Sequence, residues 1–562
     1  MARKIHSIIT VKGKLKAVSP IHVGGTGFDV DTDLPLARDG QGRYYIPGTS
    51  LAGALRDWFR VAHWIKSGIT CVQATGGQEP ERVRQRWGFV EERTDAGIAS
   101  RVIIEDALVD GDPEAEIRDG VGIDRVYGSA APHVKFDRAI LPAGTTFDFK
   151  MHIETEDPAD EVDVLQELSA FLDVFREEGI RLGAAVTRGL GRVALSDFTV
   201  EKRCFSTRQG ILQVLAGKPE KVGISTEQVG NLPLPPRLRI TIHWKPVGPV
   251  MVKAGQEGLG VDMLPLATGR DSDVALVIPG SSIKGALRSH AERIMRTLLN
   301  ISSPGDQAKR GANAGPQASD GGAATASQTA SEPGARRRFL LQLDVPLVRD
   351  IFGYARRPKR SSQDKSGGSE PSNRGVLSVS DCHACDRIKD KTWRALLGAP
   401  SEQEVLKALN RSGTRIRWDV AFHVAVDRWT GGAAQGMLYT VLEPHAAQWE
   451  AIRLELDLFR LPDHLHLPAV ALLLLLLRDM SEGWIPLGFG TNRGLGAIEV
   501  TGIQFALDPP SNGMPVSPLH DVRWNGSFDS QASQSLPLEF LEQVRRAWRA
   551  YLEEAQQTLG GN

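Results

Sequence analysis

Two loops of the 562-residue sequence hold aspartates where their carboxylates could do chemistry. The first loop, "HVGGTGFDVDTDLPLARDGQGRYYIPG", contains Asp33 directly before "LP", together with Asp29, Asp31 and Asp39. The second, "GVDMLPLATGRDSD", contains Asp262 before "MLP". A carboxylate can accept a proton from an attacking hydroxyl or hold a divalent ion. The structural alternative is that these aspartates only cap turns, which is common in loops.

Each aspartate loop is followed by a short helix entry that suits an anion. "IPGTSLAGALR" begins at Ile46 and "IPGSSIKGALR" at Ile278. The free N–H groups and the dipole at a helix start attract negative charge such as a phosphate. In the alternative interpretation, the Ser and Thr side chains only cap the helix. The candidate phosphate contacts are Ser50 and Arg56 in the first copy and Ser282, Lys284 and Arg288 in the second.

A glycine-rich motif also occurs twice, as "TRGLG" and "NRGLG". Glycine allows tight turns and close backbone approach to a ligand, and the arginine would meet phosphates. A nucleotide-binding loop is the rival, but no G-x-G-x-x-G lies between a strand and a helix and no Walker motif occurs. The sequence therefore argues against a Rossmann or P-loop enzyme. The candidates here are Arg188, Gly189, Gly191, Arg493, Gly494 and Gly496.

A third pair, "VGIDRVYGSAA" and "VAVDRWTGGAA", combines an arginine with an aromatic residue in an alternating run. Arg125 and Arg428, with Tyr127 and Trp429 beside them, predict extended hairpins that could contact bases. A surface hairpin stabilised by cross-strand packing is the alternative.

The four cysteines include one C-x-x-C pair, Cys382 and Cys385 in "DCHAC". One such pair is half a zinc site, and no second pair completes it, so zinc is only an alternative here. So few cysteines fit a reducing cytoplasm rather than a disulfide scaffold.

The paired motifs recur in one order, which indicates a tandem duplication. Alternating, strand-like runs open both halves, at Ile8 and Arg237. The helix entries lie 232 residues apart, whereas the later Gly-Leu-Gly motifs lie 305 apart. The second half has therefore gained about seventy residues. Two low-complexity stretches, near 301–338 and 355–375, supply most of them and are predicted to be disordered.

Each half is expected to run strand, helix, strands, helix, strand, which fits a ferredoxin-like split βαβ unit. The predicted fold is α+β, with two tandem ferredoxin-like (RRM-like) domains, insertions, and antiparallel sheets packed by helices. We expect the first domain over 1–205, a linker over 206–236, the second domain over 237–508, and a tail over 509–562 that includes a helix.

Composition predicts a soluble globular protein, with 41% hydrophobic residues and a net charge of −1. This excludes a uniformly basic nucleic-acid binder but not a local basic face. The longest apolar run, "LPAVALLLLLL", falls short of the ~20 residues of a membrane span and predicts a buried helix. No signal-peptide pattern opens the chain, so we expect a cytoplasmic protein without a membrane partner.

Taken in order, the aspartate loop, "IPGSSIKGALR" and the closing "RGLG" resemble the RAMP superfamily of CRISPR-associated proteins. The "IDR" hairpin resembles that of backbone subunits in type III CRISPR effector complexes. Two such domains in one chain are similar to the fused double backbone subunit of a type III-D-like effector. The match covers roughly residues 5–200 and 235–505.

The resemblance implies a subunit that binds a CRISPR guide RNA, joins other type III effector subunits and cleaves complementary target RNA. It assigns catalysis to the loop aspartates, hence Asp33 and Asp262, with Mg²⁺ or another divalent cation. It assigns the helix entries, the glycine loops and the hairpin arginines to RNA binding. Asp262 departs from the pattern by one extra residue before its proline. The alternatives are a non-catalytic scaffold in the same complex and an endoribonuclease that processes CRISPR repeat RNA.

Overall fold

The computed structural model describes residues 3–25, 32–69, 79–91, 96–223, 232–255, 258–270, 273–302, 339–355, 372–445, 447–508, 522–524 and 536–560. These residues form two compact units. Unit 1 comprises residues 1–117, 138–236 and 268–274, and unit 2 comprises 118–137, 237–267 and 275–562. The sequence halves therefore correspond broadly to the units, with two short segments exchanged.

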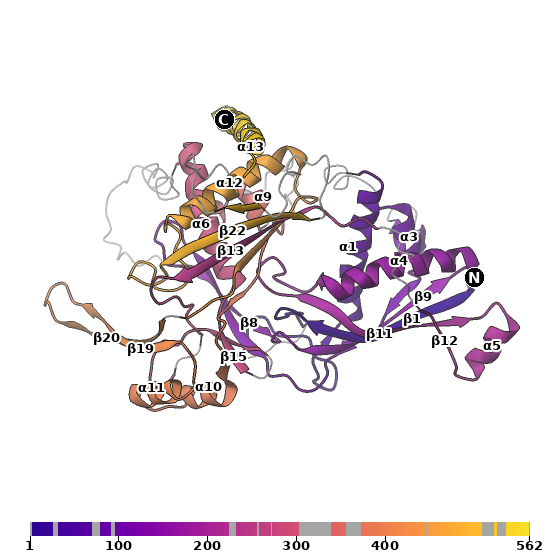
Figure 1. The fold of residues 1–562 in the computed structure, drawn as a ribbon, viewed down its shortest axis with the longest axis horizontal. Helices are drawn as coiled ribbons and strands as arrows, with labels where there is room; N and C mark the ends of the chain where they lie inside the picture. The colour runs from indigo at the N-terminus through magenta and orange to yellow at the C-terminus, as the bar shows by residue number, and fades with distance from the viewer. Residues whose placement is uncertain are drawn as a thin grey trace, which may run out of the picture. The chain divides into compact units, whose positions relative to one another are not determined.

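Unit 1 is built on a six-stranded sheet around β1 (Ser7–Ala17) (Figure 1). β1 pairs antiparallel with β9 (Thr146–Thr155) on one side and β11 (Arg192–Cys204) on the other. β5 (Val102–Ile104) extends the β9 side, whereas β10 (Ile180–Arg181) and β12 (Glu220–Lys221) pair with β11. Alternation along β1 buries Ile9, Val11 and Leu15, as the sequence predicted.

Two long helices supply the rest of the unit 1 core. α1 (Gly48–Lys66) buries Leu51 and Leu55, and α4 (Pro158–Glu177) packs Phe171 and Phe175 against the sheet. α4 starts sharply because the Asp157 side chain accepts a hydrogen bond from the Asp160 N–H, 2.9 Å away. The smaller elements are α3 (Glu81–Trp87), α5 (Arg208–Leu215), β2 (Tyr45–Ile46), β3 (Phe89–Glu91), β4 (Ala96–Ile98) and β6 (Ala107–Leu108).

Unit 2 repeats this sheet around β13 (Arg237–Pro246). β21 (Ile452–Asp457) and β22 (Ile498–Asp508) flank β13, with β16 (Leu377–Val379) beyond β21 and β23 (Val522–Trp524) beyond β22. The order β16-β21-β13-β22 thus matches β5-β9-β1-β11 of unit 1. This agreement confirms the duplication at the level of topology.

The helices of unit 2 include the predicted core helix. α12 (Asp463–Ser481) has the length and composition of a membrane span, but 72% of its most apolar window is buried within the protein. α6 (Gly280–Leu298) is the counterpart of α1, and α13 (Leu538–Gly560) packs on α12. The other elements of unit 2 are α9 (Val348–Phe352), α10 (Asp390–Leu397), α11 (Glu402–Asn410), β17 (Cys382–His383) and β18 (Ile388–Lys389). All of β14 (Ala267–Arg270) except Ala267, and the first two residues of β15 (Asp273–Ile278), belong to the 268–274 segment of unit 1.

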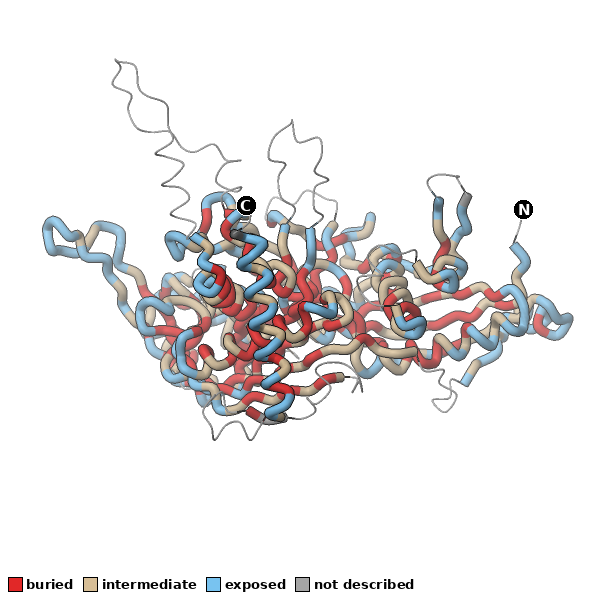
Figure 2. Tube along the Cα trace, turned by 90° about the horizontal axis from the view of Figure 1, so that it is seen from above, coloured by how far each residue is buried: buried red, intermediate tan, exposed pale blue. Residues whose placement is uncertain are grey.

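Each half also contains a long hairpin at the place that the sequence predicted. The first is β7 (Glu116–Ile123) with β8 (Ala130–Ile140), and the second is β19 (Arg417–Val426) with β20 (Ala433–His445). The tip of the first hairpin, residues 118–137, belongs to unit 2. In Figure 1, β19 and β20 extend past α10 and α11, and Figure 2 shows that their tip is exposed.

The observed fold is α+β with antiparallel sheets, as predicted. The disorder predicted near 301–338 and 355–375 falls mostly outside the described residues. Within the predicted linker, α5 and β12 are ordered elements of unit 1, and the predicted tail contains α13.

Candidate functional site

Asp33 and Asp262 occupy the same position in their units. Leu34, the residue after Asp33, forms a parallel bridge with Arg138 of β8. Met263, the residue after Asp262, forms the same parallel bridge with Val441 of β20. Both aspartates are exposed. The aspartates that the sequence selected in separate halves are therefore positional equivalents.

The backbone around the two aspartates pairs residue for residue. Ala37 N donates to Val23 O at 2.8 Å, and Leu266 N donates to Val252 O at 2.7 Å. The bridge between Gly24 and Leu36 is likewise repeated between Lys253 and Pro265. Counting from these bonds, no residue is inserted after Asp262, which corrects the sequence interpretation. The proline has moved by one position instead, because Leu264 stands where the first copy has Pro35.

The glycine loops hold the segments that precede the aspartate loops. Gly191 N donates to Pro20 O at 2.8 Å, and Gly496 N donates to Pro249 O at 2.9 Å. Gly191 has φ +81°, and a Cβ there would lie 2.1 Å from Leu182 O. Gly189, Gly494 and Gly496 also have positive φ. The motif is therefore required for this turn, which places Arg188 or Arg493 beside the aspartate segment.

In unit 1 a second arginine joins Arg188. Burial, followed by the nearby charge of Arg188, lowers the pKa of Arg138 to about 10. Arg188 retains exposed surface, although packing around its guanidinium lowers its pKa as well. Arginine remains charged at neutral pH in either case. Two neighbouring cations in the unit that carries Asp33 favour a phosphate.

Unit 2 surrounds Asp262 differently. Asp262 Oδ2 accepts hydrogen bonds from Thr440 N at 2.7 Å and from Thr440 Oγ1 at 2.9 Å. Arg493 donates to the Tyr439 hydroxyl and lies over the Phe489 ring, 5.1 Å from its centroid. Val441 replaces Arg138. The second site thus has an anchored carboxylate and one arginine fewer.

His22 is a structural residue. Its Nδ1 lies 2.7 Å from Ala139 O, and burial lowers its pKa. Its own carbonyl accepts from Ala184 N, just as that of Met251 accepts from Phe489 N. Because methionine takes the equivalent position, the arrangement does not need an imidazole.

At each helix entry, an aspartate side chain of the protein already occupies the place expected for an anion. Gly48 N donates to Asp106 Oδ1 at 2.7 Å, and Gly280 N donates to Asp381 Oδ1 at 2.8 Å. A Cβ at Gly48 would lie 2.3 Å from Ile104 O. Ser50 and Ser282 are half-buried behind these contacts. The start of each helix is therefore capped by an aspartate of its own unit. This arrangement does not support the prediction that the helix entries bind phosphates.

The basic residues of the same helices are engaged within the protein. Arg56 donates to Gly88 O and Arg288 to Gly353 O, both at 2.9 Å. Lys284 is buried, with its Nζ 2.7 Å from Leu377 O. Arg56 also pairs with Glu79, and Arg288 with Glu292. The predicted RNA contacts Arg56, Lys284 and Arg288 are thus placed as structural residues.

The two hairpin arginines have different surroundings. Arg125 Nε lies 2.6 Å from Glu292 Oε2 within unit 2, and its side chain is largely buried. Arg428 is exposed at the tip of the second hairpin. Arg125 and Arg428 therefore lie in different environments although their sequence motifs are alike. Of the two, only Arg428 is exposed to a ligand.

The surroundings of Cys382 and Cys385 give no support to the alternative of a zinc site. Burial raises the pKa of Cys382 to about 12, and its thiol donates to Glu450 O at 3.1 Å. Zinc binds the thiolate form. Over the described ranges, no three His, Cys, Asp or Glu side chains gather as a metal site, and Cys71 lies outside those ranges.

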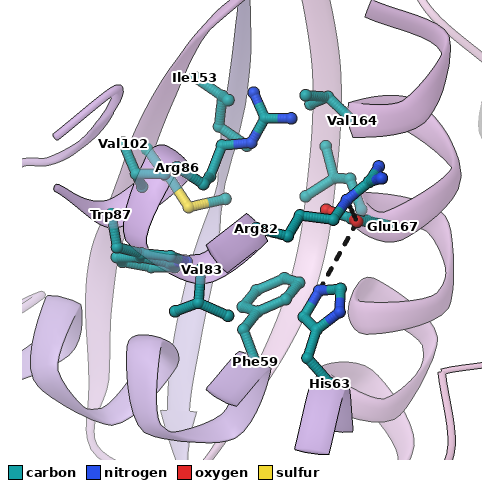
Figure 3. A pocket seen from close by; sticks show the side chains of 12 residues that line it. Phe59, His63, Arg82, Val83, Arg86, Trp87, Val102, Ile153, Val164 and Glu167 are labelled. Carbon is teal, nitrogen blue, oxygen red and sulfur yellow. Dashed lines mark ion pairs between the residues drawn. The ribbon is translucent and has the colours of Figure 1, made fainter. Parts of the chain in front are cut away.

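A small cavity in unit 1 lies apart from the aspartates, between α1, α3 and α4 (Figure 3). Glu167 pairs there with Arg82 at 2.5 Å and lies 3.6 Å from His63 Nε2. The volume of about 30 Å³ is that of a single water molecule. This cavity is too small for a nucleotide, so we assign it no role in the site.

Sequence reasoning missed Arg138, Thr440 and the capping pair Asp106 and Asp381. Asp106 and Asp381 lie in "IIEDALVD" and "SVSDCHAC", two similar segments that follow the helix entries of their halves, and this similarity could have identified them. Arg138 and Thr440 have no counterpart of the same residue type in the other half, so a comparison of the two halves could not identify them. Only the pairing of the loop with the hairpin places them beside the aspartates.

The family comparison covers both units. The model of the RAMP superfamily matches residues 14–194 and 249–499. The two matched regions include both aspartates, both helix entries and the "TRGLG" and "NRGLG" motifs. A search of curated proteins finds no match. Because the family model matches well over half of the chain, in two tandem regions, the protein belongs to the RAMP superfamily.

Proposed function

We propose that this protein is a guide-RNA-binding backbone subunit of a type III CRISPR effector complex that cleaves complementary target RNA at two positions. The observation that carries the proposal is the equivalent placement of Asp33 and Asp262, each held against a hairpin strand. Membership of the RAMP superfamily supports the CRISPR assignment. Two such units in one chain support a fused, type III-D-like subunit.

We assign the fold of each unit to the ferredoxin-like (RRM-like) class. In unit 1 the order β1, α1, β5, β9, α4, β11, with the sheet order β11-β1-β9-β5, is that of a split βαβ unit. Unit 2 follows the same path through β13, α6, β16, β21, α12 and β22. RRM-type sheets are a common platform for single-stranded RNA.

The guide is held mainly at the glycine loops. Arg188 in unit 1 and Arg493 in unit 2 are exposed on these turns. Arg138 adds a second cation in unit 1. Contacts of this kind read the RNA backbone rather than its bases, which suits a subunit that accepts any guide sequence.

The aspartates act on the paired target strand. In each site the carboxylate accepts the proton of the RNA 2′-hydroxyl, which attacks the adjacent phosphorus. The bond to the 5′-oxygen of the next nucleotide breaks, and that oxygen leaves as the new 5′-hydroxyl after protonation by water. The need for a 2′-hydroxyl explains cleavage of RNA rather than DNA.

The residues fit a transiently held Mg²⁺ or similar ion. Asp262 uses only Oδ2 for Thr440, which leaves Oδ1 for a ligand. Mg²⁺ commonly binds one or two carboxylates together with waters and substrate phosphates. When bound, the ion would neutralise charge that develops on the phosphate. Asp33 would supply the carboxylate in unit 1.

Two alternatives use the same scaffold. A non-catalytic backbone subunit would keep the guide contacts and lack a role for the aspartates. A repeat-RNA processing enzyme would cut its RNA as an isolated chain. The paired aspartates favour target cleavage within a complex, and we expect the complex to act in the cytoplasm without a membrane partner.

The test uses the effector complex assembled with its guide RNA and a labelled complementary RNA. We expect the double variant D33N/D262N to bind target as the wild type does and to lose cleavage. Asparagine keeps an acceptor for Thr440, so the fold is preserved. Undiminished cleavage by the double variant would establish the scaffold function instead, and cutting of repeat RNA by the isolated chain would establish the processing enzyme.

A further inference from the structure

The helices α6, α12 and α13 of unit 2, which lie together in Figure 1, surround an open cavity. Its volume of about 600 Å³ lies within the usual range for small-molecule sites. Its wall combines aliphatic side chains with two tryptophans and two arginines, and none of these belongs to an aspartate loop or a glycine loop. The cavity is therefore a candidate ligand site separate from the residues assigned to RNA.

A buried polar pair holds Arg293 at the wall of this cavity. His290 Nε2 lies 2.6 Å from Asp479 Oδ2, and the two side chains are 9% and 11% exposed. Arg293 can only donate, so it donates to His290 Nδ1, and the ring proton is on Nε2 toward Asp479. Burial lowers the pKa of His290, which keeps the ring neutral and able to accept this bond. Arg293 itself is exposed, and among the described residues no carboxylate pairs with it.

The corresponding helix of unit 1 shows that the fold does not need these polar side chains. The two helix entries, which bond equivalent aspartates, fix the register of α1 against α6. In this register Trp58 stands where α6 has His290, and Val61 stands where it has Arg293. Trp58 packs on Phe171 of α4, with the ring centroids 4.9 Å apart. Apolar packing thus serves in unit 1, and the oriented arginine is specific to unit 2.

Trp484 adds a flat apolar surface to the same cavity. It follows α12, and its side chain is 65% exposed. The indole N–H donates to Glu482 Oε2 at 3.2 Å, so the faces of the ring remain for a ligand. Exposed aromatic faces stack on planar rings such as nucleobases. An indole face and an arginine in one cavity therefore match a planar ring that carries an oxyanion.

We propose that this cavity binds a nucleoside monophosphate, with its base stacked on Trp484 and its phosphate bound by Arg293. The planar guanidinium suits a phosphate because it can donate two parallel hydrogen bonds. The volume leaves room for a sugar between the base and the phosphate. His290 and Asp479 orient Arg293 before the ligand arrives, which reduces the entropy lost on binding. The proposal does not rest on guide binding or target cleavage.

Isothermal titration calorimetry of the RNA-free, full-length chain with AMP tests the proposal. The wild type should bind AMP at one site. R293Q removes the phosphate contact and W484A removes the stacking surface, so each should raise the Kd by about tenfold or more, the usual scale for a charged hydrogen bond or a stacked base. R545Q removes an exposed arginine of α13 that does not line the cavity and should bind AMP as the wild type does.

Two smaller probes separate the contacts. Adenosine lacks the phosphate and inorganic phosphate lacks the base, so each should bind about tenfold more weakly than AMP or worse. Equal affinity for AMP and either smaller probe would contradict a site that uses both contacts.

Arg293 and Trp484 are both exposed, so their variants should fold, and melting temperatures equal to that of the wild type check this. Failure of the folded wild type to bind AMP would overturn the proposal, as would an unchanged Kd in R293Q or in W484A. Tighter binding of N-acetyltryptophan than of AMP would assign the cavity to a carboxylate ligand instead. Affinity for single-stranded RNA that falls in R293Q, without AMP binding, would assign it to RNA, and either result would overturn the proposal.

Discussion

At the residue scale, Asp33 and Asp262 share a position but have different neighbours. Thr440 fixes Asp262 through three hydrogen bonds, whereas the loop of Asp33 pairs with a strand that carries Arg138. The first site is therefore richer in positive charge, and the carboxylate of the second is held by Thr440. Because the two aspartates occupy equivalent positions but have different neighbours, we expect substitutions around them to affect the two sites differently.

Thr440→Val should impair only the site of unit 2. The substitution removes both Oγ1 bonds, one to the Asp262 carboxylate and one from the Asp262 N–H. It leaves only the bond from Thr440 N to the carboxylate, which therefore gains freedom. Loss of a group that orients a functional carboxylate typically costs about tenfold or more in activity. Single-turnover cleavage at the two positions of the target RNA measures the effect. T440S keeps the hydroxyl and should restore the rate, and equal losses at both positions would contradict the assignment.

Substitution of Arg188 should weaken RNA binding, whereas substitution of Arg56 should lower the stability of the fold. Arg188 is an exposed cation, so R188Q should reduce the slope of log affinity against log salt by about 0.7 for single-stranded RNA. Arg56 bonds Gly88 O and Glu79, so R56Q should lower the melting temperature and leave the salt slope unchanged. Guide-RNA titrations over a salt series check both. A reduced slope in R56Q alone would reverse the two roles.

His22 should make stability depend on pH. Burial lowers its folded-state pKa, so the unfolded chain takes up the proton first as the pH falls below about 6.5. Stability is thus present above that pH and is lost as the pH falls toward the folded-state pKa. H22M, which copies Met251, should show a smaller fall in melting temperature between pH 7.5 and 5.5. Exposed His464→Gln is the control, and identical pH profiles for H22M and wild type would refute this.

At the element scale, the repeated motifs fix the path of the backbone. The helix entries bring Gly48 and Gly280 against strand carbonyls and aspartates, and the glycine loops bond to the segments before the aspartate loops. Close packing is therefore enough to explain why the glycines of these motifs recur. The proposed RNA-binding surface is therefore narrower than the set of repeated basic residues suggests, because Arg56, Lys284 and Arg288 bond within the protein.

Two glycines of α1 test this view of the helix entry. A Cβ at Gly48 would lie 2.3 Å from Ile104 O, whereas one at Gly53 would meet nothing within 4 Å. Forced overpacking costs about 1–3 kcal/mol, so G48A should lower the melting temperature by several degrees. G53A should keep or raise it, because alanine favours a helix over glycine. Thermal unfolding of the full chain distinguishes them, and equal melting temperatures would contradict the close contact.

The strands and helices could be predicted from the sequence, but the contacts between residues far apart in the chain could not. Alternation predicted β1 and β13, and the apolar run predicted α12, because periodicity and hydrophobicity are local properties. Lys284 looked like a phosphate contact because nothing in its own segment reveals that Leu377 O lies beside it. Thr440 was missed for the same reason, since it lies 178 residues from Asp262.

At the scale of the whole molecule, each unit repeats one sheet order, one loop pairing and one glycine loop. One difference lies beside the two aspartates, where Arg138 of unit 1 corresponds to Val441 of unit 2. Duplication thus explains two similar candidate sites in one chain. One chain with two such units would place two cuts on one target strand.

The position of the cuts in end-labelled target RNA tests this account most directly. The complex with wild-type protein should cut at two positions assigned to this chain. D33N should abolish one cut and D262N the other, each leaving the remaining cut at its normal rate, and D33N/D262N should abolish both. Loss of both cuts in either single variant, or retention of both in the double variant, would contradict one independent catalytic aspartate in each unit.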